Sequence, residues 1–162
     1  MMKEPKEIFE YLIQEFGEEG LSFETGDVGE PWIEIPAESV IQIMKFLRDD
    51  PGLQFNVLMC LSGVHYDSEE ALGVTYHINS TINSSKLALK VKVPEEDAIV
   101  PSVESIWKTA NWHEREAYDM VGIRFKDHPN LKRILTAEDW EGYPLRKDYV
   151  QQEFYQGIPT GE

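Results

Sequence analysis

The chain has 162 residues, 41% of them hydrophobic, which is enough for one folded domain with a buried core. Its 30 acidic residues outnumber its 15 basic residues, and the net charge of −15 argues against phosphate-rich partners such as nucleic acid or an anionic membrane surface. The single cysteine, Cys60, excludes an intrachain disulfide and an iron–sulfur cluster held by this chain alone, since such clusters need about four cysteines.

Cys60 lies in the apolar run VLMCLSGV and is predicted to be a small buried residue. The N-terminal sequence MMKEPKEIFEYL lacks the pattern of a secretory signal. No stretch approaches the roughly 18 apolar residues that are needed to span a bilayer. We therefore expect a protein that faces the cytosol and has no membrane span of its own.

The first fifty residues predict two helices with two short strands between them. Residues 7–16 place their apolar side chains on one helical stripe, which ends near Gly17. Residues 22–25 and 32–35 are short strand candidates around a turn-rich stretch. Residues 36–48 show helical spacing again, with Asp49-Asp50-Pro51-Gly52 as the stop signal.

The next fifty residues predict three strands joined by tight connections. Residues 55–66 are nearly continuous in apolar character, and residues 72–79 and 87–93 alternate between apolar and polar. Short turns between them favour an antiparallel meander, with His77 on the polar side of its strand. Residues 94–101, rich in acid and proline, are predicted to be a linker.

A helical region follows the linker, as one helix or two over residues 103–121, with Ser102 as the candidate N-cap. Residues 123–125 are a candidate edge strand. These elements together predict an α+β fold: a two-layer domain over residues 1–126, with helices packed on a mainly antiparallel sheet of about four strands.

A carboxylate interrupts the apolar stripe of the last helix. Trp107, Ala110, Glu114, Ala117 and Val121 share one helical face, so Glu114 is predicted to be buried and held by a basic partner or by backbone N–H groups. Arg115 and Asp119, four residues apart, can pair on a neighbouring face.

The same helix allows a metal-site interpretation. His113, Glu116 and Asp119 can point one way from a helix, and a complete site would need further ligands, for which His65, Asp67 and His128 are the available types. A small metal-dependent enzyme using these residues is therefore one candidate function. A structural subunit of an electron-transfer assembly and a regulatory binding module are the others.

Residues 127–162, called the tail below, are predicted to be an extended segment that binds a partner. The tail has few periodic apolar positions, yet it is rich in aromatic residues interleaved with Arg133, Arg146 and Lys147. An extended segment cannot pair its own backbone, so we expect a partner to supply its hydrogen bonds and to order it.

The last helix and the start of the tail carry a multi-part pattern: Glu114-Arg115-Glu116, Asp119-Met120-Val121, His128, Lys132 and Ile134-Leu135, separated by two, six, three and one residues. The pattern resembles the signature of the thirty-kilodalton subunit of respiratory complex I, the NADH:quinone oxidoreductase. The flanking stretches agree with it from about Gly73 to Val150, without departure inside the signature.

The resemblance implies a non-catalytic structural subunit in the peripheral arm of a proton-translocating NADH:quinone oxidoreductase. Such a subunit has no active site, and we expect no catalytic, cofactor-binding or metal-ligating residue in this chain. NADH, FMN, iron–sulfur clusters and quinone are bound elsewhere in the assembly. The implied partners are the large quinone-site subunit, which the tail wraps, and the neighbouring iron–sulfur subunits.

The resemblance also implies a peripheral place on the cytoplasmic side of the membrane. The alternative that it leaves open is the equivalent subunit of a photosynthetic or hydrogenase-type relative with another electron donor.

Overall fold

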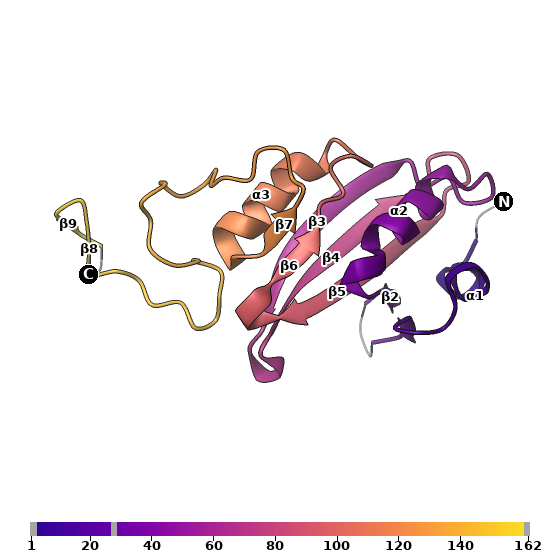
Figure 1. Cartoon of the computed structure of the whole chain (residues 1–162), viewed down its shortest axis with the longest axis horizontal. Coiled ribbons are helices and arrows are strands. Elements are labelled where there is room, and N and C mark those ends of the chain that lie inside the picture. The colour runs from indigo at the N-terminus through magenta and orange to yellow at the C-terminus, as the bar shows by residue number, and fades with distance from the viewer. Residues whose placement is uncertain (1–2, 27–28, 161–162) are drawn as a thin grey trace.

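A computed structural model describes residues 3–26 and 29–160. The body of the molecule is a five-stranded sheet in the order β1-β2-β5-β4-β3, and the tail leaves it at one end (Figure 1). Strands β3 (Val57–Tyr66), β4 (Ala71–Asn79) and β5 (Lys86–Pro94) form the antiparallel meander that the alternating sequence predicts. The predicted fold class, two-layer α+β, is therefore confirmed.

The two short strands of the N-terminal region complete the sheet. Strand β1 (Ser22–Glu24) pairs antiparallel with β2 (Trp32–Glu34), and β2 pairs parallel with β5. The sheet therefore has five strands rather than about four. Helix α1 (Pro5–Phe16) and helix α2 (Val40–Asp49), which follows a 3-10 turn at Ala37–Ser39, begin and end close to the predicted limits.

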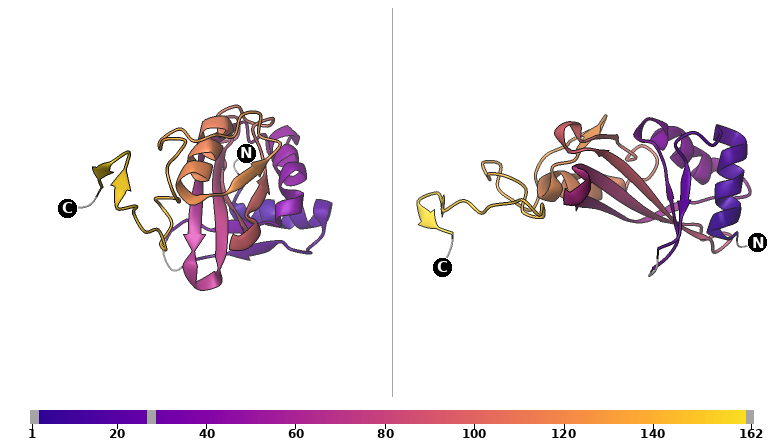
Figure 2. Two further views of the ribbon diagram at one scale, coloured as in Figure 1. Left: turned by 60° about the vertical axis from the view of Figure 1, so that its left-hand side comes forward. Right: turned by 90° about the horizontal axis from the view of Figure 1, so that it is seen from below.

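The core lies between the helices and one face of the sheet. Inward residues of the strands, such as Tyr76 and Leu89, are fully buried against apolar residues of α1 and α2, such as Leu12 and Met44. Helix α3 (Ala110–Val121) packs over β3, where Gly63 lies against Ala117 and Val121. Figures 1 and 2 show the helical layer on the sheet, with the tail extending beyond it.

The prediction of a linker over residues 94–101 is wrong for residues 99–101. Strand β6 (Ile99–Pro101) lies there and pairs parallel with β7 (Arg124–Lys126), which is the predicted edge strand. A 3-10 turn, Glu95–Asp97, precedes β6. Strand β6 could not be found by its own pattern because three residues show no useful periodicity, and its partner lies beyond a whole helix.

Two local predictions also need correction. The helical region is one α-helix that begins at Ala110, and turns occupy the residues before it. Ser102 therefore does not cap α3, and its Oγ instead accepts the N–H of Glu104 at 3.2 Å. Cys60 is half-exposed instead of buried, because it lies on the outward side of β3 next to a register shift between Leu58 and Cys60.

Candidate functional site: the anchored tail

Helix α3 carries a buried carboxylate, Glu114, which binds the segment of the chain that precedes the helix. Glu114 is 0% exposed; its Oε2 accepts the Ser102 hydroxyl at 2.6 Å, and its Oε1 accepts the Val103 N–H at 2.7 Å. Burial raises the pKa of the Glu114 carboxyl to about 7, although the hydrogen bonds from Ser102 and Val103 lower it. The predicted burial of Glu114 is confirmed, with a backbone N–H as one of its partners.

His128 links the first residues of the tail to α3. Its Nε2 lies 3.1 Å from the Asn111 carbonyl and 3.9 Å from Glu114 Oε2, and its Nδ1 accepts the Asn130 N–H at 3.0 Å. Because Nδ1 is an acceptor, the ring hydrogen of the neutral imidazole lies on Nε2 and is donated to Asn111. The imidazole thus joins the tail to the N-terminal turn of α3.

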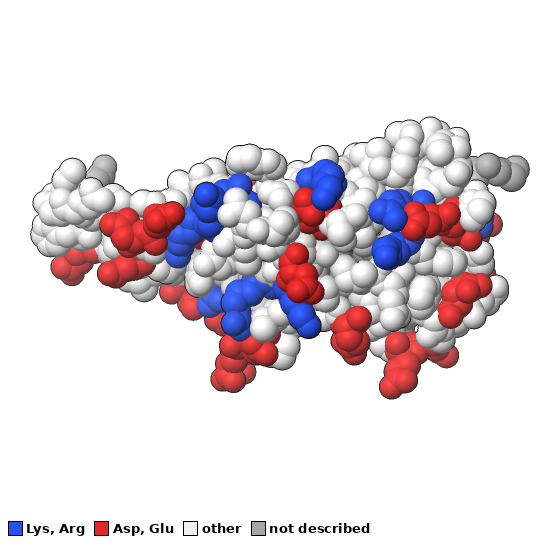
Figure 3. Space-filling model, turned by 45° about the horizontal axis from the view of Figure 1, so that its top comes forward, with Lys and Arg blue, Asp and Glu red and all other residues white. Residues whose placement is uncertain are grey.

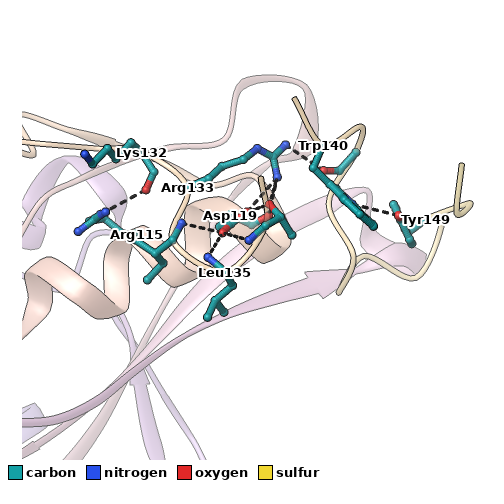
Figure 4. A network of polar contacts seen from close by, with 10 residues as sticks. Arg115, Asp119, Lys132, Arg133, Leu135, Trp140 and Tyr149 are labelled. Carbon is teal, nitrogen blue, oxygen red and sulfur yellow. Dashed lines mark hydrogen bonds and ion pairs between the residues drawn. The ribbon is translucent and has the colours of Figure 1, made fainter. Parts of the chain in front are cut away.

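Asp119 organises the next part of the tail. Its carboxylate accepts the N–H groups of Ile134, Leu135 and Thr136 at 2.9, 2.7 and 3.0 Å (Figure 4). The Thr136 hydroxyl and Arg133 Nη1 donate to its second oxygen. Burial alone would raise the pKa of Asp119, but the hydrogen bonds from Thr136, Leu135 and Ile134 outweigh it and lower the pKa to about 2.

The predicted pair of Arg115 with Asp119 is wrong. Arg115 instead donates from Nε to the Lys132 carbonyl at 3.2 Å (Figure 4). Its guanidinium lies over the exposed Trp112 ring, 4.7 Å from the centroid. Asp119 takes its ion pair from Arg133, at 2.9 Å, on the tail. Arg115 and Asp119 therefore bind the tail instead of each other.

A second group of contacts clamps residues 143–147 to the body. The Tyr143 ring lies against Gly122, which has φ +89° and where a Cβ would come within 2.7 Å of the ring. Leu145 N–H donates to the Met120 carbonyl at 2.9 Å, and Arg146 donates to the Val121 carbonyl and to Glu95 at 2.7 and 2.8 Å.

The expectation that a partner supplies the tail's hydrogen bonds is therefore wrong for residues 132–136 and 145–147. The body provides them through α3, the Glu95 turn and His65, whose Nδ1 accepts the Lys147 N–H at 3.1 Å. The boundary between body and tail at residue 127 remains a prediction, and polar contacts cross it.

The tail beyond residue 149 has a different character. It projects from the body (Figure 1) and ends in a two-stranded hairpin, β8 (Phe154–Tyr155) with β9 (Ile158–Pro159). Its apolar side chains face solvent: Val150, Phe154 and Ile158 are 85%, 60% and 68% exposed. Contacts of this part are mostly within the tail, such as the tilted packing of the Trp140 ring against the Tyr155 ring, with the ring centroids 5.2 Å apart.

The structure does not assemble the predicted metal ligands. Asp119 is occupied by the tail, and His113 Nδ1 lies 3.2 Å from the Leu61 N–H at the edge of β3. In the described part of the chain, the group with possible ligand spacing is His65, Glu95 and Asp148 instead. There His65 Nδ1 accepts the Lys147 N–H, so Nε2 carries the ring hydrogen and faces Glu95 Oε2 at 3.4 Å. In this arrangement the Lys147 N–H occupies Nδ1, whereas Nε2 is buried without a hydrogen-bond partner among the described residues.

The pattern that runs from Glu114 to Leu135 is therefore a set of contacts between one helix and the start of the tail. Residues 33–155 match the family described as "Respiratory-chain NADH dehydrogenase, 30 Kd subunit". The chain belongs to this family.

Relatives and solved structures of the family agree with the assignment. A NADH-quinone oxidoreductase subunit of Chlorobium phaeobacteroides is 43% identical over 97% of this chain and 95% of its own length. The protein of the same name from Chloroherpeton thalassium is 53% identical over 70% of this chain and 47% of its length. The trypsin-resistant fragment of Nqo5 has a TM-score of 0.65 and 31% identity, covering 75% of this chain and 98% of the fragment.

A more distant structure shares the fold. A chain in the structure of the membrane-bound sulfane sulfur reductase, an archaeal respiratory membrane complex, has a TM-score of 0.72 over 90% of this chain and 85% of its own, at 19% identity. Within the pattern from Glu114 to Leu135, the side chains of Glu114, Arg115 and Asp119 are buried, and His128 Nε2 lies 3.9 Å from Glu114.

Sequence reasoning missed the clamp made by Tyr143, Arg146 and His65. The contacts join residues 25, 51 and 82 positions apart, which no local period reveals. The sequence offered one signal for this clamp, which is Gly122. A glycine directly after a helix often adopts a left-handed conformation, and a neighbouring ring can pack against its backbone.

Proposed function

We propose that this chain is a non-catalytic structural subunit in the peripheral arm of a proton-translocating NADH:quinone oxidoreductase, bracing the large quinone-site subunit with its tail. Membership of the family supports the assembly, and the curated relatives are named as subunits of NADH-quinone oxidoreductase. The chain would support electron transfer from NADH through iron–sulfur clusters to quinone without an active site of its own.

The observation that carries the proposal is the division of the tail into two parts. His128 and residues 132–136 and 145–147 are fixed to the body by charged and backbone hydrogen bonds. Beyond them, Val150, Phe154 and Ile158 hold their apolar side chains away from the body, and the far end of the tail is formed mostly by uncharged residues (Figure 3). A rigid base that presents exposed apolar groups is suited to a permanent interface with another protein of the assembly.

The same contacts determine where the tail should be cut in a test. Removal of everything after Phe125 would take away the partners of Asp119 and the Arg146 clamp, so loss of folding and loss of binding would be confused. A chain that ends after Val150 keeps these contacts. We expect it to melt near the temperature of the full chain but to fail to co-purify with the large quinone-site subunit.

Point variants in the projecting part refine the test. Phe154→Ser with Ile158→Ser removes exposed apolar surface, whereas Gln151→Ala with Glu153→Gln changes the same segment without doing so. The first pair should weaken co-purification and the control pair should not. Normal co-purification of the serine variant and of the shortened chain would refute the proposed role of the tail.

We propose further that this chain binds no redox group and that its partners place it at the cytoplasmic side of the membrane. No helix among the described residues is long and apolar enough to cross a bilayer. The neighbouring iron–sulfur subunits are proposed as additional partners. Purification of the assembly followed by NADH-dependent quinone reduction tests the NADH-linked function; a complex that lacks an NADH-binding subunit would favour the alternative with another electron donor.

A further inference from the structure

One histidine of the sheet is buried where the body meets the tail. His65, on β3, is 4% exposed, and both of its ring nitrogens face groups from other parts of the chain. Nδ1 accepts the Lys147 N–H at 3.1 Å and lies 3.6 Å from Asp148 Oδ1, and Nε2 lies 3.4 Å from Glu95 Oε2. The imidazole therefore contacts two successive tail residues on one side and the turn after β5 on the other.

The hydrogen bond from Lys147 defines the protonation of the ring. Because Nδ1 accepts a backbone N–H, it carries no hydrogen, and the neutral imidazole has its hydrogen on Nε2. Nε2 is buried without a hydrogen-bond partner in the described part of the chain, although the Glu95 carboxylate is its neighbour. A buried N–H that is left unpaired is costly, so the neutral ring is satisfied at only one of its two nitrogens.

A second proton on the ring changes the tail residue that His65 can hold. A protonated imidazole donates from both nitrogens and accepts at neither. The Lys147 N–H would then face another N–H, and their hydrogen bond could not form. Asp148 Oδ1 is the acceptor nearest to Nδ1, and Glu95 Oε2 can accept from Nε2. Protonation therefore moves the contact from the backbone of residue 147 to the side chain of residue 148.

The charged groups that face His65 favour the protonated ring, whereas burial opposes it. Among the described residues, Glu95 of the 3-10 turn and Asp148 of the tail are the carboxylates within ion-pair distance of the imidazole. Arg146 lies on the other side of Glu95, to which it donates at 2.8 Å. Two carboxylates stabilise an imidazolium, and removal from water destabilises it. The two protonation states of the ring are therefore both supported by their surroundings.

The other elements packed around His65 present uncharged side chains to it. On β4 the residue opposite His65 is Leu72. Helix α3 lays Ala117 and Val121 against Gly63, two residues earlier on the same side of β3. The charge around the ring therefore comes from the turn after β5 and from the tail.

Solvent reaches the carboxylates on both sides of the ring. The side chains of Glu95 and Asp148 are 27% and 53% exposed, although that of His65 is buried. An open hollow of about 690 Å³ adjoins Glu95, and Glu70 and Glu96 also line it. The two carboxylates thus connect the buried imidazole to water.

We propose that His65 is a proton-controlled latch on the tail, which holds the backbone of Lys147 when the imidazole is neutral and the carboxylate of Asp148 when it is protonated. The exchange takes place directly before the projecting part of the tail, which begins at Val150. It therefore changes the direction in which the exposed apolar groups are presented. Only this consequence in the assembly rests on the proposed function; the exchange itself is a property of the single chain.

Amide hydrogen exchange in the isolated full chain, followed by NMR, tests the latch. Protection of the Lys147 N–H, corrected for the intrinsic pH dependence of exchange, should fall roughly tenfold from about pH 8 to about pH 5.5, because an ordinary imidazole is mostly protonated at the lower pH. The ring nitrogen shifts of His65 should show a hydrogen on Nε2 alone at the higher pH and on both nitrogens at the lower pH.

Three variants locate the effect. His65→Gln should keep the Lys147 protection at both pH values, since a carboxamide oxygen can accept the N–H and does not take up a proton. His77→Gln, on the polar side of β4, is the matched control and should behave as the wild type. Asp148→Asn should move the loss of protection to lower pH, because the amide does not stabilise the protonated ring.

Three results would overturn the latch: Lys147 protection that is independent of pH in the wild type, an equal fall in His65→Gln, or an unshifted profile in Asp148→Asn. The last variant changes an exposed side chain, so it decides the matter even where His65→Gln fails to fold.

Co-purification with the assembly tests the consequence. Recovery of the wild type should fall severalfold at the lower pH and that of His65→Gln should not, and an equal loss in both would mean that the latch does not act on assembly. Normal binding of the chain that ends after Val150 would refute the proposed function and leave the exchange result standing, so the two failures are distinguishable.

Discussion

Glu114 should make the domain more stable as the pH falls from about 8 to about 5, which is unusual for a carboxylate. Its pKa in the folded chain is about 7, against an ordinary value of 4.5. A group with a raised folded pKa stabilises the fold fully below its unfolded pKa, and that contribution is lost as the pH rises through the folded pKa. The difference of pKa corresponds to about 3 kcal/mol between the two ends of this window.

The perturbation that isolates this effect is Glu114→Gln. Glutamine keeps the size of the side chain and an oxygen that can accept the Val103 N–H and the Ser102 hydroxyl, but it does not ionise. The free energy of unfolding should be measured in urea at several pH values between 5 and 8 for both proteins. The change of the wild type relative to the variant should amount to about 3 kcal/mol over this window.

The comparison cancels the titration of groups that do not interact with Glu114. Parallel pH profiles for the two proteins would refute the reasoning, because Glu114 would then ionise in the folded chain as it does in the unfolded chain. A matched control is Glu116→Gln, since Glu116 is exposed on the same helix and should leave the profile unchanged.

Other substitutions test the anchoring of the tail. Asp119→Asn should lower the free energy of unfolding by about 2–3 kcal/mol, because the amide oxygen can replace only the carboxylate oxygen that accepts the N–H groups of residues 134–136, and the amide NH₂ would then face Arg133 Nη1; urea melts at pH 7 measure it. Arg115→Ala, which leaves the Lys132 carbonyl unpaired, should cost about 1.5–3 kcal/mol, and a cost near zero would contradict this contact. Gly122→Ala should lower the melting temperature by several degrees, since φ is +89° and the Tyr143 ring fills the space, whereas an unchanged melting curve would mean that the ring is displaced without cost. Metal analysis of the isolated chain should find no stoichiometric iron or zinc, and one metal per chain lost in His65→Ala would contradict the hydrogen-bonded role of His65.

The sequence by itself determined the regular elements of the body. A helical stripe over residues 7–16 and strict alternation over residues 87–93 report which side of each element is buried, because the side-chain period of a helix or strand follows from its own backbone. The same logic placed Glu114 in the core, since it occupies a position on an otherwise apolar stripe. The signature from Glu114 to Leu135 pointed to the family.

Only the tertiary structure decided what the charged groups of α3 bind. Arg115 and Asp119 are one turn apart and could pair, yet each takes partners 14 to 17 residues further on in the tail. No local pattern distinguishes these outcomes, because an irregular segment has no period and its backbone groups can be paired by any donor or acceptor nearby. The pairing of β2 with β5 likewise arises from a contact between distant strands, which is fixed when the sheet assembles.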